Sequence, residues 1–190
     1  EDAYERDGVP VRRTGLICTV ELEKLGGSIL PHERVLERPI QDRLGLLRET
    51  RTHFSPIFFV CDDPARAIVD RVVRWQETHP FETFRGTSSG LIHRLWSIDD
   101  PEELAALSGL FAERQLLIAD GHHRYQTAWN YSQEEGSPAG AADMLAYVSF
   151  FPSEGLQIEA FHRIARTTIP ADDLIRRLER TFDIEELPLD

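Results

Sequence analysis

The stretch Gln115–Arg124, QLLIADGHHR, is the part of the sequence that most clearly decides the fold. Its first half, Gln115–Ala119, is a short apolar run of the kind that forms a buried β-strand. Asp120 and Gly121 follow at once, and apolar residues at helical spacing begin at Tyr125. The stretch therefore predicts a strand that turns directly into a helix, with two histidines and an arginine in the first helical turn.

A helix that begins in this way is a candidate site for phosphate. The amides of His122, His123 and Arg124 would have no helical acceptor, and the positive end of the helix dipole lies beside them. The side chains of these residues add cationic donors, and Gly121 lets the backbone turn closely. Asp120 could hold a magnesium ion or take a proton. An ordinary reading stays open, in which Asp120 caps the helix and the histidines face solvent.

The remaining elements alternate irregularly along the chain. Asp62 or Asp63 is expected to cap a helix that Pro64 opens. Two late strands are expected to form a β-hairpin around residues 152–155. This mixture predicts an α+β fold with a mixed sheet, not a doubly wound one. Strands are expected near 14–22, 56–61, 91–98, 115–119, 144–151 and 156–165, and helices from about 39, 64, 101, 122 and 170.

A second motif, Pro31-His32-Glu33, precedes the helix expected from Pro39. Alone it is typical of a surface, but a Glu33 carboxylate facing the phosphate turn could deprotonate an attacking hydroxyl. Arg43 is a candidate ligand contact, although an ordinary ion pair would also explain it. His162 and Arg163 are further candidates, or simply a histidine at the edge of the core beside a solvated arginine.

The composition limits the classes of partner and compartment. The net charge is −12, from 21 basic and 33 acidic residues, which disfavours direct binding to nucleic acid. Cys18 and Cys61 are far apart, so neither a disulfide framework nor a cysteine-rich zinc site is expected, and a reducing, cytoplasmic compartment is. No apolar run is long enough for a membrane span. A homo-oligomer is compatible with the sequence. The polar start without methionine suggests part of a longer protein.

Five segments in order carry a resemblance to a known family. They are TGLICTVEL (14–22), ILPHERVLERPIQDRLGLLRETRTHFSPIFF (29–59), LIHRLW (91–96), LLIADGHHRYQTA (116–128) and GLQIEAFHRI (155–164). In this order they resemble the bacterial and archaeal domain-of-unknown-function 1015 family, whose members are often labelled ParB-like. The resemblance covers nearly all of the chain. Members of that family are longer at both ends, and the family itself has no settled activity.

A more distant likeness concerns the ParB/sulfiredoxin-like fold and its free-serine kinases. It implies that Glu33 is the general base, that Asp120 assists the hydroxyl or a metal, and that Gly121–Arg124 hold phosphates. It also implies a core over residues 1–140 with an insertion at about 62–113. A C-terminal hairpin and helix, 141–190, would pack on the same domain. The separate DNA-binding helical module of ParB proteins is not visible in this sequence.

Three functions follow from these patterns. The first is a nucleotide-dependent phosphotransferase or nucleotide hydrolase, acting on a free amino acid or another small hydroxyl-bearing metabolite. It would use ATP or ADP with Mg²⁺, with Glu33, Asp120 and His122 as catalytic residues. The second is a metal-dependent hydrolase, although adjacent histidines on a helix point about 100° apart. Its ligands would be His32, Asp120, His122, His123 and His162. The third is a noncatalytic module that senses a nucleotide.

Overall fold

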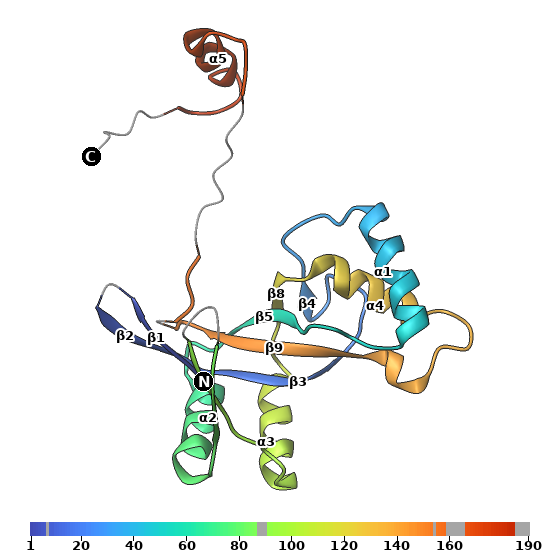
Figure 1. The fold of residues 1–190 in the computed structure, drawn as a ribbon, viewed down its shortest axis with the longest axis vertical. Helices are drawn as coiled ribbons and strands as arrows, with labels where there is room; N and C mark the ends of the chain where they lie inside the picture. The colour runs from blue at the N-terminus through green and yellow to red at the C-terminus, as the bar shows by residue number, and fades with distance from the viewer. Residues whose placement is uncertain (7, 87–90, 154, 159–165, 185–190) are drawn as a thin grey trace. The chain divides into compact units, whose positions relative to one another are not determined.

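The computed structural model describes residues 1–6, 8–86, 91–153, 155–158 and 166–184 (Figure 1). The chain divides into two compact units, Glu1–Gln157 and Ile158–Asp190. Within the described residues the first unit holds two β-sheets and four α-helices, and the second holds the short helix α5 (Ala171–Leu178). The predicted α+β class is therefore confirmed. No helix in these ranges has both the length and the apolar character that a membrane crossing requires.

The larger sheet has five strands in the order β3-β9-β5-β8-β4. The central strand β5 pairs parallel with β9 and antiparallel with β8, while β9 also pairs antiparallel with β3 and β8 also pairs parallel with β4. The sheet is thus mixed, as the sequence predicts. Its strands are β3 (Gly15–Glu21), β4 (Ile29–Leu30), β5 (Ile57–Asp62), β8 (Leu116–Asp120) and β9 (Asp143–Phe151).

One face of this sheet carries the main core. Ile57, Phe59 and Cys61 alternate along β5, and each is 0% exposed. Their neighbours on β9 alternate in the same register, so side chains from both strands project from one face. Helices supply the other half of the core through Ile68, Val69, Val72, Leu107, Tyr125 and Ala128.

The helices of the first unit contact one another in two pairs. The helix α1 (Glu37–Thr50) packs on α4 (His122–Ser132), and the two lie side by side in Figure 1. The helix α2 (Ala67–Thr78) contacts α3 (Pro101–Phe111). Arg71 of α2 donates two hydrogen bonds to Glu103 of α3, at 2.7 and 2.6 Å. The short 3₁₀ helix η1 (Ala139–Ala142) leads into β9.

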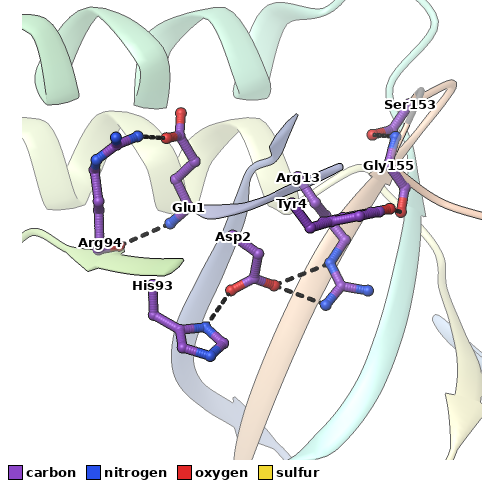
Figure 2. Close-up of polar contacts among 8 residues, drawn as sticks. All are labelled: Glu1, Asp2, Tyr4, Arg13, His93, Arg94, Ser153 and Gly155. Carbon is purple, nitrogen blue, oxygen red and sulfur yellow. Dashed lines mark hydrogen bonds and ion pairs between the residues drawn. The ribbon is translucent and has the colours of Figure 1, made fainter. Parts of the chain in front are cut away.

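A second, four-stranded sheet has the order β2-β1-β7-β6 and is antiparallel throughout. The carboxylate of Asp2 links segments far apart in the sequence, because it accepts hydrogen bonds from both Arg13 and His93 (Figure 2). The sequence did not predict β1, since its polar residues resemble a terminal tail. The strands are β1 (Asp2–Arg6), β2 (Val9–Arg13), β6 (Glu82–Arg85) and β7 (Ile92–Leu95).

The C-terminal hairpin expected from the sequence is not formed in the described residues. Its first strand exists as β9, but β3 and β5 occupy both edges of that strand. Residues 155–158 are not in a strand, and 159–165 lie outside the described ranges. A helix near residue 170 was expected and is present as α5.

Asp63 organises the start of α2 from four residues upstream. Its carboxylate, in a side chain that is 1% exposed, accepts the amides of Ala67, Ile68 and Val69, each at 3.0 Å. Asp63 was one of the two caps that the sequence allowed. The helix begins at Ala67, three residues later than expected.

We predict that Asp63→Ala lowers the free energy of unfolding by about 3 kcal/mol, because three amides lose a charged acceptor in a buried place. Urea unfolding followed by circular dichroism measures the change. Asp62→Ala is the matched control, since Asp62 is adjacent but exposed. Equal losses in the two variants would contradict this account of the cap.

Candidate functional site

The turn between β8 and α4 requires glycine at position 121. Gly121 has a φ of +105°, a backbone conformation that residues other than glycine rarely adopt. A Cβ added there would lie 2.8 Å from Ile57 Cδ1 and 3.0 Å from Arg124 Nη2. The backbone therefore passes directly from the buried strand into the helix, as the sequence predicts.

The first turn of α4 leaves amides without a helical acceptor. The first helical hydrogen bond runs from the Tyr125 amide to the Gly121 carbonyl at 2.9 Å. The amides of His122, His123 and Arg124 precede it, and no side chain in the described part of the chain caps this helix. These amides and the helix dipole make the turn a place where an anion is stabilised.

Both histidines of the turn hold the segment that precedes α1. His122 Nε2 accepts the amide of His32 at 3.2 Å, and His123 Nε2 accepts the amide of Leu36 at 3.0 Å. A ring nitrogen that accepts an N–H carries no proton itself. Each ring is thereby assigned as the neutral form with its proton on Nδ1. The sequence suggested that His122 and His123 are cationic donors, but both rings instead accept hydrogen bonds from backbone amides.

Glu33 lies against His122, as the two motifs in the sequence suggested it would. Its Oε1 is 3.2 Å from His122 Nδ1, the nitrogen that carries the proton. The His122 side chain is 2% exposed and that of Glu33 is 51% exposed. A buried imidazole thus orients a carboxylate whose other side faces solvent.

Burial lowers the pKa of His122 below its ordinary value of 6.5, and the neighbouring His32 lowers it further. Glu33 and Asp120 act in the opposite direction on the same pKa but do not reverse the shift. The neutral ring required by the hydrogen bond from His32 is therefore also the form that its surroundings favour.

His32 presents a free ring nitrogen beside Glu33. Its Nδ1 lies 2.7 Å from the Ile118 carbonyl, which can only accept, so Nδ1 carries a proton. In the neutral ring Nε2 is then bare and can take a proton or a ligand. The ring meets that of His122 edge to face, with the centroids 4.4 Å apart.

Arg124 is turned back onto the protein. Its Nη2 pairs with Asp120, and its Nη1 donates to Ser55 Oγ at 2.6 Å and to the Pro56 carbonyl. The guanidinium therefore ties α4 to the segment before β5 and shares its charge with Asp120. The expectation that Arg124 contacts phosphate remains a prediction, and a bound anion would have to compete with Asp120.

The other predicted site residues lie elsewhere or are not described. Arg43 is exposed on α1 and donates to the Pro39 carbonyl at 3.3 Å. His162 and Arg163 lie outside the described residues. The site thus joins His32, Glu33, Asp120, Gly121, His122, His123 and Arg124. Within the described ranges, Arg43 makes no hydrogen bond or ion pair with these residues.

Sequence reasoning missed the supporting residues around the site. The contact of Ser55 with Arg124 could not be predicted, because a serine before proline is common in loops. Tyr125 was predicted only as part of the apolar helix face. Its hydroxyl in fact donates to the Glu23 carbonyl at 2.9 Å and accepts the Glu23 amide at 3.0 Å. The Tyr125 side chain is 0% exposed, and a fully buried hydroxyl needs such partners.

One group of residues in the described ranges has the spacing of a metal site. The ligand atoms of His32, Glu33 and His122 all lie within 4.8 Å of one another. His122, however, already uses both ring nitrogens, one to accept from His32 and one to donate to Glu33. It could bind a metal only by giving up one of these bonds. The geometry therefore leaves His32 and Glu33 as the free donors.

We predict that stability falls as pH drops below 6.5. The unfolded chain protonates His122 near its ordinary pKa of 6.5, whereas the folded ring resists protonation until a lower pH. The contribution of the neutral His122 ring to the free energy of unfolding is complete above pH 6.5. It is lost as the pH falls through the pKa of the folded state. Burial also lowers the pKa of His53, so the reference protein should carry His53→Gln.

In that background His122→Gln should flatten the dependence of the urea midpoint on pH between neutral and mildly acidic buffers. His79→Gln is a suitable control because His79 is exposed and remote in sequence. An unchanged slope in the His122 variant would refute the assignment of a buried neutral ring.

Comparisons with known proteins give a family but no activity. Neither the curated proteins nor the solved structures gave a significant match. A family model described as "Protein of unknown function (DUF1015)" matches residues 3–189, nearly the whole chain. The chain therefore belongs to the DUF1015 family.

Proposed function

We propose that this protein transfers a phosphoryl group from a nucleotide to a small hydroxyl-bearing metabolite or to water. One observation carries the proposal. The partly exposed Glu33 carboxylate contacts His122, and His122 contributes one of the three unpaired amides at the start of α4. A proton acceptor and an anion site are therefore adjacent, as phosphoryl transfer requires.

Each group has a specific role in this reaction. The amides of His122, His123 and Arg124 bind oxygens of the transferred phosphate. Glu33 accepts the proton of the attacking hydroxyl while the new O–P bond forms and the bond to the leaving nucleotide breaks. The His122 Nδ1–H fixes the orientation of that carboxylate, which makes His122 a positioning residue in the proposal.

Asp120 and Arg124 fit the metal and charge that accompany a nucleotide. Asp120 is 74% exposed, and only one of its carboxylate oxygens pairs with Arg124. The second oxygen is the hard donor that Mg²⁺ prefers, so Asp120 would hold the magnesium of an ATP or ADP complex. Arg124 lies directly over Gly121 and is close enough to share its charge with a bound phosphate.

The likeness to ParB/sulfiredoxin-type free-serine kinases supports the same assignment. In that likeness the glutamate after Pro31-His32 and the DGHHR turn flank nucleotide and substrate, and these two segments are adjacent in this fold. A free amino acid with a hydroxyl is thus the first acceptor to try. The cytoplasm is the compartment that we propose, because nucleotides are abundant there.

We predict that Glu33→Gln keeps nucleotide binding and loses at least about a hundredfold in turnover, the effect typical of removing a general base. Binding is measured by thermal shift with ADP, ATP and CTP and their magnesium complexes. Turnover is measured by phosphorus NMR with free serine, other hydroxyl compounds or water as the acceptor. Glu49→Gln is the control, since Glu49 is an exposed glutamate on α1.

The outcomes separate three functions. Nucleotide binding with no turnover in any acceptor assay would indicate a noncatalytic sensing module. Full turnover in Glu33→Gln would remove Glu33 as the base. Absence of nucleotide binding in the wild-type protein would reject both the phosphoryl-transfer function and the nucleotide-sensing function.

A metal-dependent hydrolase is the second candidate, favoured by the close spacing of His32, Glu33 and His122. It predicts about one equivalent of zinc, manganese or iron in the purified protein, and loss of that metal in His32→Ala. Elemental analysis checks both. His79→Ala serves as the control. A protein without stoichiometric transition metal, even after incubation with these ions, would leave phosphoryl transfer as the reading to pursue.

A further inference from the structure

A hollow of about 1040 Å³ lies within the described residues and opens along the free edge of β3. All seven residues of β3, Gly15–Glu21, line it. Successive side chains of a strand point to opposite faces, so consecutive residues can line one hollow only along the hydrogen-bonding edge. The hollow therefore includes a groove beside that edge, and it continues across one face of the sheet to Ile29 of β4 and Leu116 of β8. Neither Glu33 nor His122 lines it, so it is separate from the site described above.

The backbone groups on this edge have no partner in the described part of the chain. The Leu22 amide donates to the Ala142 carbonyl at 2.8 Å, which fixes the phase of the antiparallel pairing of β3 with β9. Even-numbered residues of β3 then direct their N–H and C=O groups toward β9, and odd-numbered residues direct theirs into the groove. The outward set belongs to Gly15, Ile17, Thr19 and Glu21.

The opposite wall of the groove is mainly apolar. Leu104 of α3 is 48% exposed and Phe84 of β6 is 47% exposed, although both are large apolar side chains. Trp75, Trp96, Leu107 and Phe111 complete the wall. A groove with backbone donors and acceptors on one side and apolar side chains on the other has what an added β-strand requires.

The charges along the groove have a direction. Arg13 and Arg94 lie near the Gly15 end, where Figure 2 shows them paired with Asp2 and Glu1. The strand register puts Arg114 at the same end of the sheet, because Leu116 aligns through Cys61 with Phe150. Arg114 lies beside β8, however, with β9 and β5 between it and β3, and its guanidinium pairs with Asp63 at 4.0 Å. Glu21 ends β3 on the other side. The arginines at one end thus all have acidic partners, and Glu21 leaves one negative charge at the other end.

We propose that this groove binds an extended peptide segment, which adds to β3 as a sixth strand of the larger sheet. The segment would alternate apolar and polar residues, with a basic residue near Glu21. A small apolar ligand would leave the edge amides of β3 unpaired, at a cost in free energy. If β3 of a second copy paired with this edge, the elements that line its own groove would have to enter the groove as well. A single free strand therefore fits better.

The probe is a fluorescent nine-residue peptide of alternating valine and threonine, with lysine at the end that would lie beside Glu21. We expect saturable binding to the whole 190-residue chain, measured by fluorescence anisotropy. Thr19→Pro removes one outward amide without touching the β9 ladder, and proline is tolerated on an edge strand. It should weaken binding about tenfold. Thr19→Val keeps the amide and should bind as wild type does.

Two further measurements make the test independent of folding artefacts. The same peptide with alternate N-methylated amides should not bind, because its own backbone donors are blocked. Leu104→Glu places a charge on the apolar wall and should weaken binding even if Thr19→Pro fails to fold. The proposal is overturned if the probe does not bind, if the methylated peptide or Leu104→Glu binds equally well, or if a dimer that Thr19→Pro dissociates occupies the groove.

Discussion

The arrangement of the site depends on two imidazole rings that accept backbone amides. His122 and His123 begin α4, and through Nε2 they hold the amides of His32 and Leu36. These bonds place Glu33 against the helix start from a segment almost ninety residues earlier in the chain. These bonds exist only while both rings are neutral. The position of the Glu33 carboxylate therefore depends on the protonation state of His122 and His123.

The sequence predicted the strand-to-helix turn for local reasons, whereas the pairing of the turn with the Pro31-His32-Glu33 motif was a hypothesis that rested on the distant resemblance. A buried strand followed by Asp-Gly and a helical pattern allows little else, and Gly121 adopts the conformation that only glycine adopts easily. The nature of the histidine contacts could not be predicted. Whether an imidazole donates to a ligand or accepts from the backbone depends on which loop packs against it, and that is a tertiary contact.

Other differences have the same origin. The strand at β9 was recognisable from its apolar run, but its two neighbours, β3 and β5, come from earlier in the chain and could not be identified from that run. The strand β1 is polar because its side chains are used in ion pairs, such as that of Asp2 with Arg13, and not in an apolar core. Arg124 has the charge expected of a phosphate ligand, yet Asp120, Ser55 and Pro56 hold it.

The hydroxyl of Tyr125 links the helix α4 to the segment that follows β3. It bonds both the N–H and the C=O of Glu23, which follows the end of β3 by two residues, while its own helix begins at the anion-binding turn. A movement of α4 would strain both bonds at once and pull on the outermost strand. By thermodynamic reciprocity, whatever occupies one of these regions and shifts that helix must change the affinity of the other by the same factor.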